Sequence, residues 1–214
     1  MEEMKHFADF GTKIIGCGPN FLKHSDELKI AVPAVPIYFL KPRSAFLTEG
    51  NTIQMPEGCN SLHHEVELGL VIGRRARKIN REEAMDCVAG YALALDMTAR
   101  DWQMESMRSG RPWLFAKGFD GSCPVSRFIP KSEVPNPHSL DMWCAVNGEM
   151  RQHCNTSEMH FSIPDMLYHL CRHVTLEPGD LIITGTPGGA ADVQGGDVIE
   201  CGLGQLARMT FHVE

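Results

Sequence analysis

Short apolar segments, each closed by glycine, proline or a polar turn, recur along the chain and limit what it can fold into. Most of them have the length of a β-strand. We expect strands at residues 13–18, 35–40, 63–73, 88–97, 140–146, 149–153, 181–184, 197–201 and 206–213. The stretches between them favour only short helices, at residues 19–29, 81–87, 98–109 and 162–173. The sequence therefore predicts a β-rich mixed α/β fold with short helices.

The chain is short enough to form one domain around one core. Its 214 residues include 43% hydrophobic and 22% charged side chains, which is ordinary globular composition. No internal repeat, low-complexity tract or long linker divides the sequence. We therefore expect a single domain that spans residues 1–214.

Several turn and cap residues predict where individual elements begin. Asn147 and Gly148 favour the tight primed turn of a β-hairpin. Ser162 and Thr98 are each placed to cap the helix that follows them. Pro19 fits the first turn of the first expected helix, where its missing N–H costs nothing.

Charge and the length of apolar runs exclude two classes of partner. The formal net charge is −7, and a solvated turn after a strand explains the basic cluster Arg74 to Lys78, so we expect no nucleic-acid partner. No apolar run approaches the ~20 residues of a membrane helix, so we expect no membrane partner. The opening residues Met1 to Met4 show no clear targeting segment, which leaves a mitochondrial and a cytosolic location open.

The cysteines are scattered along the chain and form no CxxC pair. This pattern argues against a disulfide framework and favours a reducing compartment. Cys17, Cys87, Cys144 and Cys171 lie in apolar contexts, and we expect them in the core. The histidines show no spacing that is typical of a zinc site.

The segment His63 to Leu68 carries the strongest chemical signal. Residues two apart on a strand share a face, so Glu65 and Glu67 would present two carboxylates side by side. Such a pair requires protonation, hydrogen-bond donors or a bridging cation, and oxygen ligands favour Mg²⁺, Mn²⁺ or Ca²⁺ over zinc. From spacing alone, an exposed strand end with two solvated glutamates is the simpler explanation.

Two further residues shift that balance. Asp96 ends an apolar strand directly before a helix, where it either assists the helix cap or adds a third carboxylate to the site. Lys117 lies within an otherwise apolar stretch, residues 112–120. A lysine there needs a partner, a substrate anion or a route to the surface. A three-carboxylate site would leave open positions for water and substrate.

Two weaker signals lie elsewhere in the chain. His24 and Glu27 are three residues apart on an expected helix and share a face. A carboxylate that orients a histidine is the usual design for activating water, although such a pair is more often a surface contact. The glycine-rich turn Thr184 to Gly189 offers backbone amides to an anion, but it matches no nucleotide-binding fingerprint.

Taken in this order, the motifs resemble those of the fumarylacetoacetate hydrolase family, and most closely its small single-domain acylpyruvase and oxaloacetate decarboxylase members. The resemblance runs from residue 14 to residue 213. It rests on Gly18-Pro19-Asn20-Phe21, His24, Glu27, His63 to Gly69, Gly90-Tyr91, Leu95 to Asp101, Lys117 to Asp120, Val146-Asn147-Gly148 and Thr184 to Pro187. It implies a single-domain β-roll with short helices that forms a homodimer.

The resemblance also implies a role for each motif residue. The implied roles are metal ligands (Glu65, Glu67 and Asp96), catalytic residues (His24, Glu27 and Lys117) and substrate-binding residues (Arg100, Gln103 and Thr186). The implied metal is Mg²⁺, with Mn²⁺ accepted. The catalytic histidine and glutamate belong to a lid helix over the substrate, while the lysine stabilises an enolate.

The implied activity is the cleavage of 2-oxo acids. An acylpyruvate is hydrolysed to pyruvate and a carboxylic acid, and oxaloacetate is decarboxylated to pyruvate and CO₂, both through an enolate. One alternative is an oxaloacetate keto–enol tautomerase or an isomerase of the same family. Another is a degenerate, non-catalytic binding protein.

The chain departs from the family pattern at three positions. Many relatives carry Gly-Arg-Asn-Tyr where this chain has Pro19 and Phe21 in the second and fourth places, and Lys or Ala where it has Gly188. These changes bear on the lid and on the substrate loop. The three acids and the lysine match the family pattern.

Overall fold

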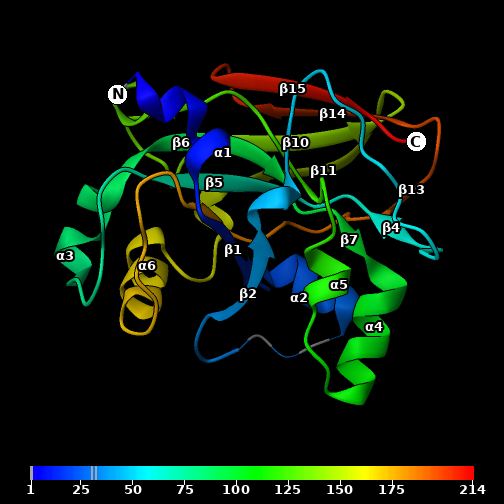
Figure 1. Cartoon of the computed structure of the whole chain (residues 1–214), viewed down its shortest axis with the longest axis horizontal. Coiled ribbons are helices and arrows are strands. Elements are labelled where there is room, and N and C mark those ends of the chain that lie inside the picture. Colours follow the sequence, from blue (N-terminus) through cyan, green and yellow to red (C-terminus); the bar gives the residue numbers. More distant parts are fainter. Residues whose placement is uncertain (1, 30, 32) are drawn as a thin grey trace.

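The computed structural model describes residues 2–29, 31 and 33–214 and contains three β-sheets within these ranges (Figure 1). The largest sheet contains, from one edge to the other, β2 (Ile37–Pro42), β1 (Lys13–Gly18), β12 (Leu181–Ile183), β5 (Val66–Ile72), β6 (Val88–Leu95), β8 (Cys123–Val125) and β3 (Phe46–Thr48). A further short strand, β9 (Ile129–Pro130), also pairs with β6.

The strand order of this sheet gathers distant parts of the chain at one end. β12 lies between β1, to which it is parallel, and β5, to which it is antiparallel. β6 then runs antiparallel to β5. The carboxyl ends of β1, β12 and β6 therefore meet the start of β5 at the same end of the sheet. Loops at such strand ends are the usual place for functional side chains.

A second sheet packs on the first and closes the core. Its strands are β11 (Glu149–Asn155), β10 (Asp141–Val146), β14 (Val198–Leu203) and β15 (Ala207–His212). Figure 1 shows this sheet lying along β5 and β6. Residues of β15 alternate between buried and exposed, as expected of a strand with one face on the core. β5 is buried along its whole length because both of its faces are covered.

A third, small sheet and the helices surround these layers. The small sheet consists of β13 (Asp192–Val193), β4 (Leu62–His63) and β7 (Thr98–Ala99). The α-helices are α1 (Phe7–Phe10), α2 (Leu22–Leu28), α3 (Arg81–Ala84), α4 (Arg100–Ser109), α5 (Leu114–Lys117) and α6 (Ile163–Cys171). Single 3₁₀ turns are η1 (Glu3–His6), η2 (Arg43–Ala45), η3 (Met85–Cys87), η4 (Lys131–Glu133) and η5 (Thr156–Glu158).

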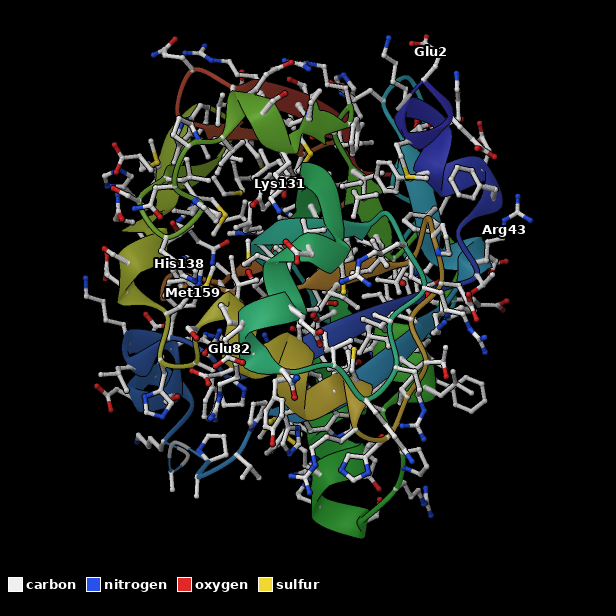
Figure 2. The ribbon with its side chains drawn as sticks, turned by 90° about the vertical axis from the view of Figure 1, so that its left-hand side faces the viewer. Glu2, Arg43, Glu82, Lys131, His138 and Met159 are labelled. Atoms are coloured by element: carbon white, nitrogen blue, oxygen red, sulfur yellow. The ribbon has the colours of Figure 1, made fainter. Side chains whose placement is uncertain are left out.

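Many charged side chains lie on the periphery of these layers, and those of the site described below are exceptions. The side view in Figure 2 shows Glu2 and Arg43 pointing outward at its edges, and both residues are exposed, as is Glu82. Cys17, Cys87, Cys144 and Cys171, expected in the core, are buried there. Within the described ranges, no helix is both long and apolar enough to cross a membrane.

The fold confirms the β-rich prediction and several of its boundaries. Asn147 and Gly148 form the expected hairpin turn, with φ angles of 52° and 77°. The Ser162 side chain caps α6 by accepting a hydrogen bond from the Asp165 N–H. The expected strand at 63–73 is divided into β4 and β5, and the helix expected to reach residue 173 ends at Cys171. Among the described residues, five short strands were not predicted: β3, β7, β8, β9 and β13.

Two of the predicted helix starts are wrong. The helix expected from Pro19 begins at Leu22, because the buried Asn20 side chain binds the Thr184 carbonyl and the Phe161 N–H and keeps this stretch extended. Thr98 does not cap α4. It lies in β7, where its hydroxyl donates to the Asp96 carbonyl and accepts a hydrogen bond from Lys117.

Candidate functional site

Three carboxylates converge where β5 begins and β6 ends. Glu67 lies within β5, Glu65 directly precedes it, and Asp96 directly follows β6. The Asp96 N–H donates to the Glu65 carbonyl at 2.8 Å, which ties the two strand ends together. One carboxylate oxygen from each residue lies within 4.8 Å of the others, and all three side chains are buried. The exposed strand end that spacing alone favoured is therefore wrong.

Lys117, at the end of α5, is buried against two of these acids and does not extend to the surface. Its Nζ lies 2.9 Å from Glu65 Oε2, 2.5 Å from Asp96 Oδ2 and 2.7 Å from the Thr98 hydroxyl. Burial opposes the ammonium charge, but Asp96 and Glu65 outweigh it and raise the pKa of Lys117 above its ordinary value. The lysine is therefore a fixed cation beside the carboxylates.

A second buried lysine, Lys41 of β2, was not predicted. Its Nζ lies 2.7 Å from Asp96 Oδ1 and donates to the backbone carbonyls of Ser122, Met97 and Lys117. The sequence places Lys41 at the end of a strand, where a lysine is normally solvated. Asp96 is thus held between two ammonium groups.

Arg100, at the start of α4, pairs with Glu65 and also donates to the Gln103 side chain. Burial alone would raise the pKa of Glu65, but Lys117 and Arg100 lower it below its usual range. Arg100 and Gln103 therefore lie at the site, as the sequence predicted.

Glu67 is in the opposite electrostatic situation. Its carboxylate accepts the Gly185 N–H at 2.7 Å. Among the described residues, no lysine or arginine forms an ion pair with Glu67. Burial, followed by the charges of Asp96 and Glu65, raises the pKa of Glu67 well above its ordinary value. A cation bound at the three acids would compensate this charge.

The donor chemistry of the three acids fits a hard divalent cation. All three supply carboxylate oxygens, which favour Mg²⁺ and Mn²⁺ over zinc. They converge at one point, with Lys117 and Arg100 beside them. The structure thus brings the predicted ligands together in a chemically suitable set.

His24 and Glu27 come from α2, on another side of the cavity. His24 is buried, and its Nδ1 lies 3.7 Å from Glu27 Oε2. Burial lowers the pKa of His24 below its ordinary value. His24 therefore forms no ordinary surface contact, and its imidazole is neutral at physiological pH.

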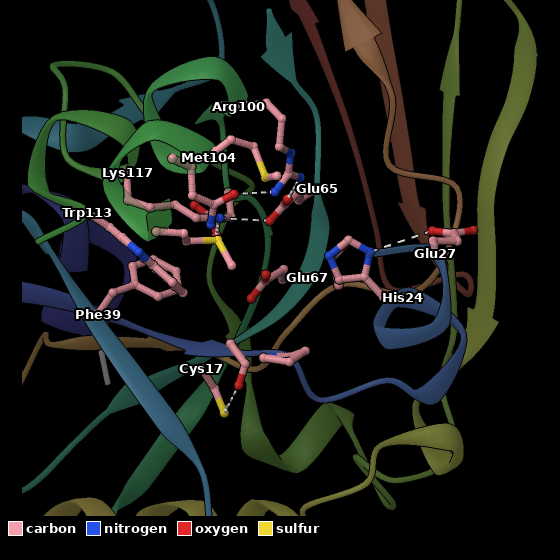
Figure 3. Close-up of a pocket in the computed structure, with 16 residues that line it drawn as sticks. Cys17, His24, Glu27, Phe39, Glu65, Glu67, Arg100, Met104, Trp113 and Lys117 are labelled. Carbon is pink, nitrogen blue, oxygen red and sulfur yellow. Dashed lines mark hydrogen bonds and ion pairs between the residues drawn. The ribbon is translucent and has the colours of Figure 1, made fainter. Parts of the chain in front are cut away.

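A cavity of about 300 Å³ connects these groups (Figure 3). Figure 3 shows Glu65 and Glu67 in the middle, His24 on one side, and Trp113 and Phe39 with Lys117 on the other. Its lining contains all nine predicted site residues: His24, Glu27, Glu65, Glu67, Asp96, Arg100, Gln103, Lys117 and Thr186. Its apolar part consists of Cys17, Pro19, Phe39, Met104, Met107 and Trp113.

Comparison with known proteins finds relatives over nearly the whole chain. The family model described as fumarylacetoacetate (FAA) hydrolase C-terminal matches residues 13–214. A human protein named oxaloacetate tautomerase FAHD1, mitochondrial, is 48% identical over 211 residues, which are 99% of this chain and 96% of that protein. A Dictyostelium discoideum protein named oxaloacetate decarboxylase, mitochondrial, is 44% identical over 201 residues, covering 94% and 92% of the two chains.

A solved structure has the same fold. It is the crystal structure of fumarylpyruvate hydrolase from Pseudomonas aeruginosa in complex with Mn²⁺ and pyruvate. The two structures superpose with a TM-score of 0.90 at 33% sequence identity, over 95% of this chain and 89% of that one. The likeness therefore extends over nearly the whole chain.

Proposed function

The chain belongs to the fumarylacetoacetate hydrolase family, and we propose that it is an Mg²⁺- or Mn²⁺-dependent enzyme that acts on oxaloacetate and related 2-oxo acids through their enolates. The observation that carries this proposal is the convergence of Glu65, Glu67 and Asp96 with Lys117 in one buried cavity. The names of the relatives support oxaloacetate as the substrate, and the P. aeruginosa complex with Mn²⁺ and pyruvate supports a divalent metal.

The three acids are the proposed metal ligands. A 2-oxo acid carries a carboxylate and an adjacent keto oxygen, which together suit chelation. When bound, the divalent cation supplies Lewis-acid stabilisation of negative charge on the substrate oxygens. Lys117 adds a positive charge at the same place, and the acids around it keep it protonated. Arg100, Gln103 and Thr186 are the proposed substrate contacts.

His24 is the proposed proton-transfer residue. Its lowered pKa leaves the imidazole neutral, and Glu27 on the Nδ1 side favours the tautomer with its proton on that nitrogen. Nε2 then holds the lone pair that accepts a proton from carbon 3 of oxaloacetate or from a water molecule. Delivery of the proton taken from carbon 3 to the enolate oxygen gives the enol, and the reverse transfer gives the keto form.

The leading activity that we propose is oxaloacetate keto–enol tautomerisation, because the human relative carries that name. Decarboxylation uses the same enolate when CO₂ is the leaving group. A second candidate is acylpyruvate hydrolysis, in which water attacks the carbonyl beyond carbon 3. The pairing of His24 with Glu27 favours it, since that pair is suited to activating water.

We also propose a mitochondrial location, because the human and Dictyostelium relatives are named mitochondrial. A homodimer is proposed from the exposed apolar side chains of Leu40, Leu114 and Phe115 on the adjoining elements β2 and α5. Sedimentation of the wild-type protein against Phe115→Lys tests the dimer. Equal masses for the two proteins would contradict this assignment of the interface.

The function is tested by following enol-oxaloacetate loss and CO₂ release in parallel after rapid mixing. We expect both rates to fall to background in EDTA and to recover with Mg²⁺. Fast enol loss with little CO₂ supports the tautomerase, whereas hydrolysis of acetylpyruvate to pyruvate supports the second candidate. Full activity of Glu65→Gln or Asp96→Asn would overturn the proposed site.

A further inference from the structure

A buried glutamine, Gln152, joins residues 65–67, which include two of the proposed metal ligands, to the glycine-rich loop at residues 184–189. Gln152 lies on β11, in the second sheet, and its side chain is fully buried although its neighbours Arg151 and His153 are exposed. Cys144 pairs with Gln152 and Ala145 pairs with Met150, so Arg151 is the extra residue of a β-bulge on β11, next to Gln152. Such a bulge sets which side chains of β11 face inward.

The amide group of Gln152 makes four close polar contacts. Its Oε1 accepts the Val66 N–H and lies 3.0 Å from His64 Nδ1, while its Nε2 donates to the Thr186 hydroxyl at 2.8 Å and to the Pro187 carbonyl at 3.0 Å. The orientation of the amide is unambiguous, because an N–H only donates and a carbonyl only accepts. His64 therefore carries its proton on Nδ1.

These contacts determine what the Thr186 hydroxyl is able to do. The hydroxyl has one proton, which it donates to the Val66 carbonyl at 3.0 Å while it accepts from Gln152. The Gln152 N–H already occupies one lone pair of the Thr186 hydroxyl oxygen. The hydroxyl proton therefore points away from Gln152, either towards the Val66 carbonyl or into the cavity that Thr186 lines. Val66 itself lies between two of the proposed metal ligands.

We infer that Gln152 is a positioning residue, which holds the Thr186 hydroxyl and the loop around it in register with residues 65–67. It does not line the cavity and acts through Thr186, which does. The kinetic consequence rests on the proposed function: Gln152 sets the affinity for the 2-oxo acid rather than the rate of the chemical step. Its effect on the loop is independent of the reaction.

The first experiment compares two buried substitutions. Gln152→Met keeps the length of the side chain and removes its hydrogen bonds. Thr156→Val is the matched control, because the buried Thr156 hydroxyl also holds two backbone groups, those of Leu140 and Pro137, and does not line the cavity. With Mg²⁺ we expect the KM for oxaloacetate to rise about tenfold in Gln152→Met with kcat little changed, and neither to change in the control.

A double-mutant cycle tests whether Gln152 acts through Thr186. Thr186→Val removes the hydroxyl from the other side of the contact. If Gln152 works through that hydroxyl, adding Gln152→Met to Thr186→Val raises KM no further than the single change at Thr186. If the increases in KM caused by the two single changes multiply in the double variant, the inference is overturned.

Hydrogen exchange of the metal-free protein separates this inference from the proposed function. Exchange at residues 185–189 should accelerate in Gln152→Met and stay at the wild-type rate in Thr156→Val. If the wild-type protein turns over no 2-oxo acid, the proposed function fails and the exchange result alone decides about Gln152. Wild-type exchange together with wild-type KM in Gln152→Met overturns the inference. Should this variant not fold, Gln152→Glu is tested in its place, since it keeps Oε1 and replaces the donor with an acceptor.

Discussion

Glu27 on helix α2 accepts the backbone N–H of Gly189 with both carboxylate oxygens, at 2.9 and 3.1 Å. The catalytic partner that we propose for His24 is therefore attached to the glycine-rich loop. A side chain at Gly188 would place its Cβ 2.7 Å from Glu27 Oε1. The departure from the family pattern at Gly188 thus makes room for this contact.

Replacing Gly188 should disturb helix α2, the proposed lid, without disturbing the proposed metal site. In Gly188→Ala we expect Glu27 to move away from the loop and acetylpyruvate hydrolysis to slow by about tenfold, which is within the usual contribution of a general base. The Mg²⁺ affinity should be unchanged, because no metal ligand is touched. Steady-state kinetics and calorimetric Mg²⁺ titration measure the two quantities.

Gly195→Ala is the control for that change, because the Cβ it introduces meets its closest atom at 3.8 Å. We expect wild-type kinetics from it. Wild-type hydrolysis by Gly188→Ala would mean that the contact between Glu27 and the loop has no part in catalysis.

The shared face of Glu65 and Glu67 could be predicted from the sequence because residues two apart on a strand point the same way. Their proposed role as metal ligands came from the resemblance to the family, since spacing alone favoured an exposed strand end. Asp96 could be placed because it follows an apolar strand. Lys41 and Gln152 could not be found this way. Lys41 directly follows an expected strand, and Gln152 lies in a polar hairpin segment. Their burial results from how the sheets pack, which local pattern does not contain.

The same limit explains the errors at helix starts. Thr98 has the sequence of a helix cap, but Lys117 and the Asp96 carbonyl compete for its hydroxyl. Pro19 has the sequence of a first-turn residue, but Asn20 is held by partners more than a hundred positions away, such as Phe161. In both cases a tertiary hydrogen bond overrides a local preference.

Removing the partner of a buried charge should reduce stability much more than removing the partner of an exposed charge. In Lys41→Met, Asp96 loses one of its two ammonium partners, and we expect unfolding to become easier by about 3–5 kcal/mol. Arg75→Met, which breaks the exposed pair with Glu177, should change stability little. Urea denaturation in EDTA measures both. Equal losses in the two variants would show that burial does not set the strength of the Lys41 pair.

Glu67 should destabilise the metal-free protein, and it should be required for stabilisation by Mg²⁺. It is buried beside two other acids, and its pKa is raised, so in the metal-free protein it must carry either an unfavourable charge or an extra proton. Glu67→Gln removes that cost, and we expect the metal-free variant to melt at a higher temperature than the wild type. The rise in melting temperature that Mg²⁺ causes in the wild type should be lost. An undiminished Mg²⁺ shift in Glu67→Gln would exclude this residue as a ligand.

His138 should make stability depend on pH. Its Nε2 accepts the Ile163 N–H at the start of α6, at 3.1 Å, on the side of the molecule shown in Figure 2. Burial lowers the pKa of His138 below its ordinary value of 6.5. The unfolded chain therefore binds the proton first as pH falls, and stability is lost from about pH 6.5 down to the folded-state pKa. Protonation also removes the acceptor and puts a positive charge at a helix N-terminus.

The substitution that isolates this effect is His138→Gln, which offers an amide oxygen to the same N–H and does not titrate. We expect its free energy of unfolding to change less than that of the wild type between pH 7.5 and pH 5 in EDTA. The exposed His153→Gln serves as control and should keep the wild-type slope. If His138→Gln and His153→Gln show the same pH slope, the cap at Ile163 contributes nothing to the acid sensitivity. In that case the loss of stability must come from other buried histidines, of which His24 is one.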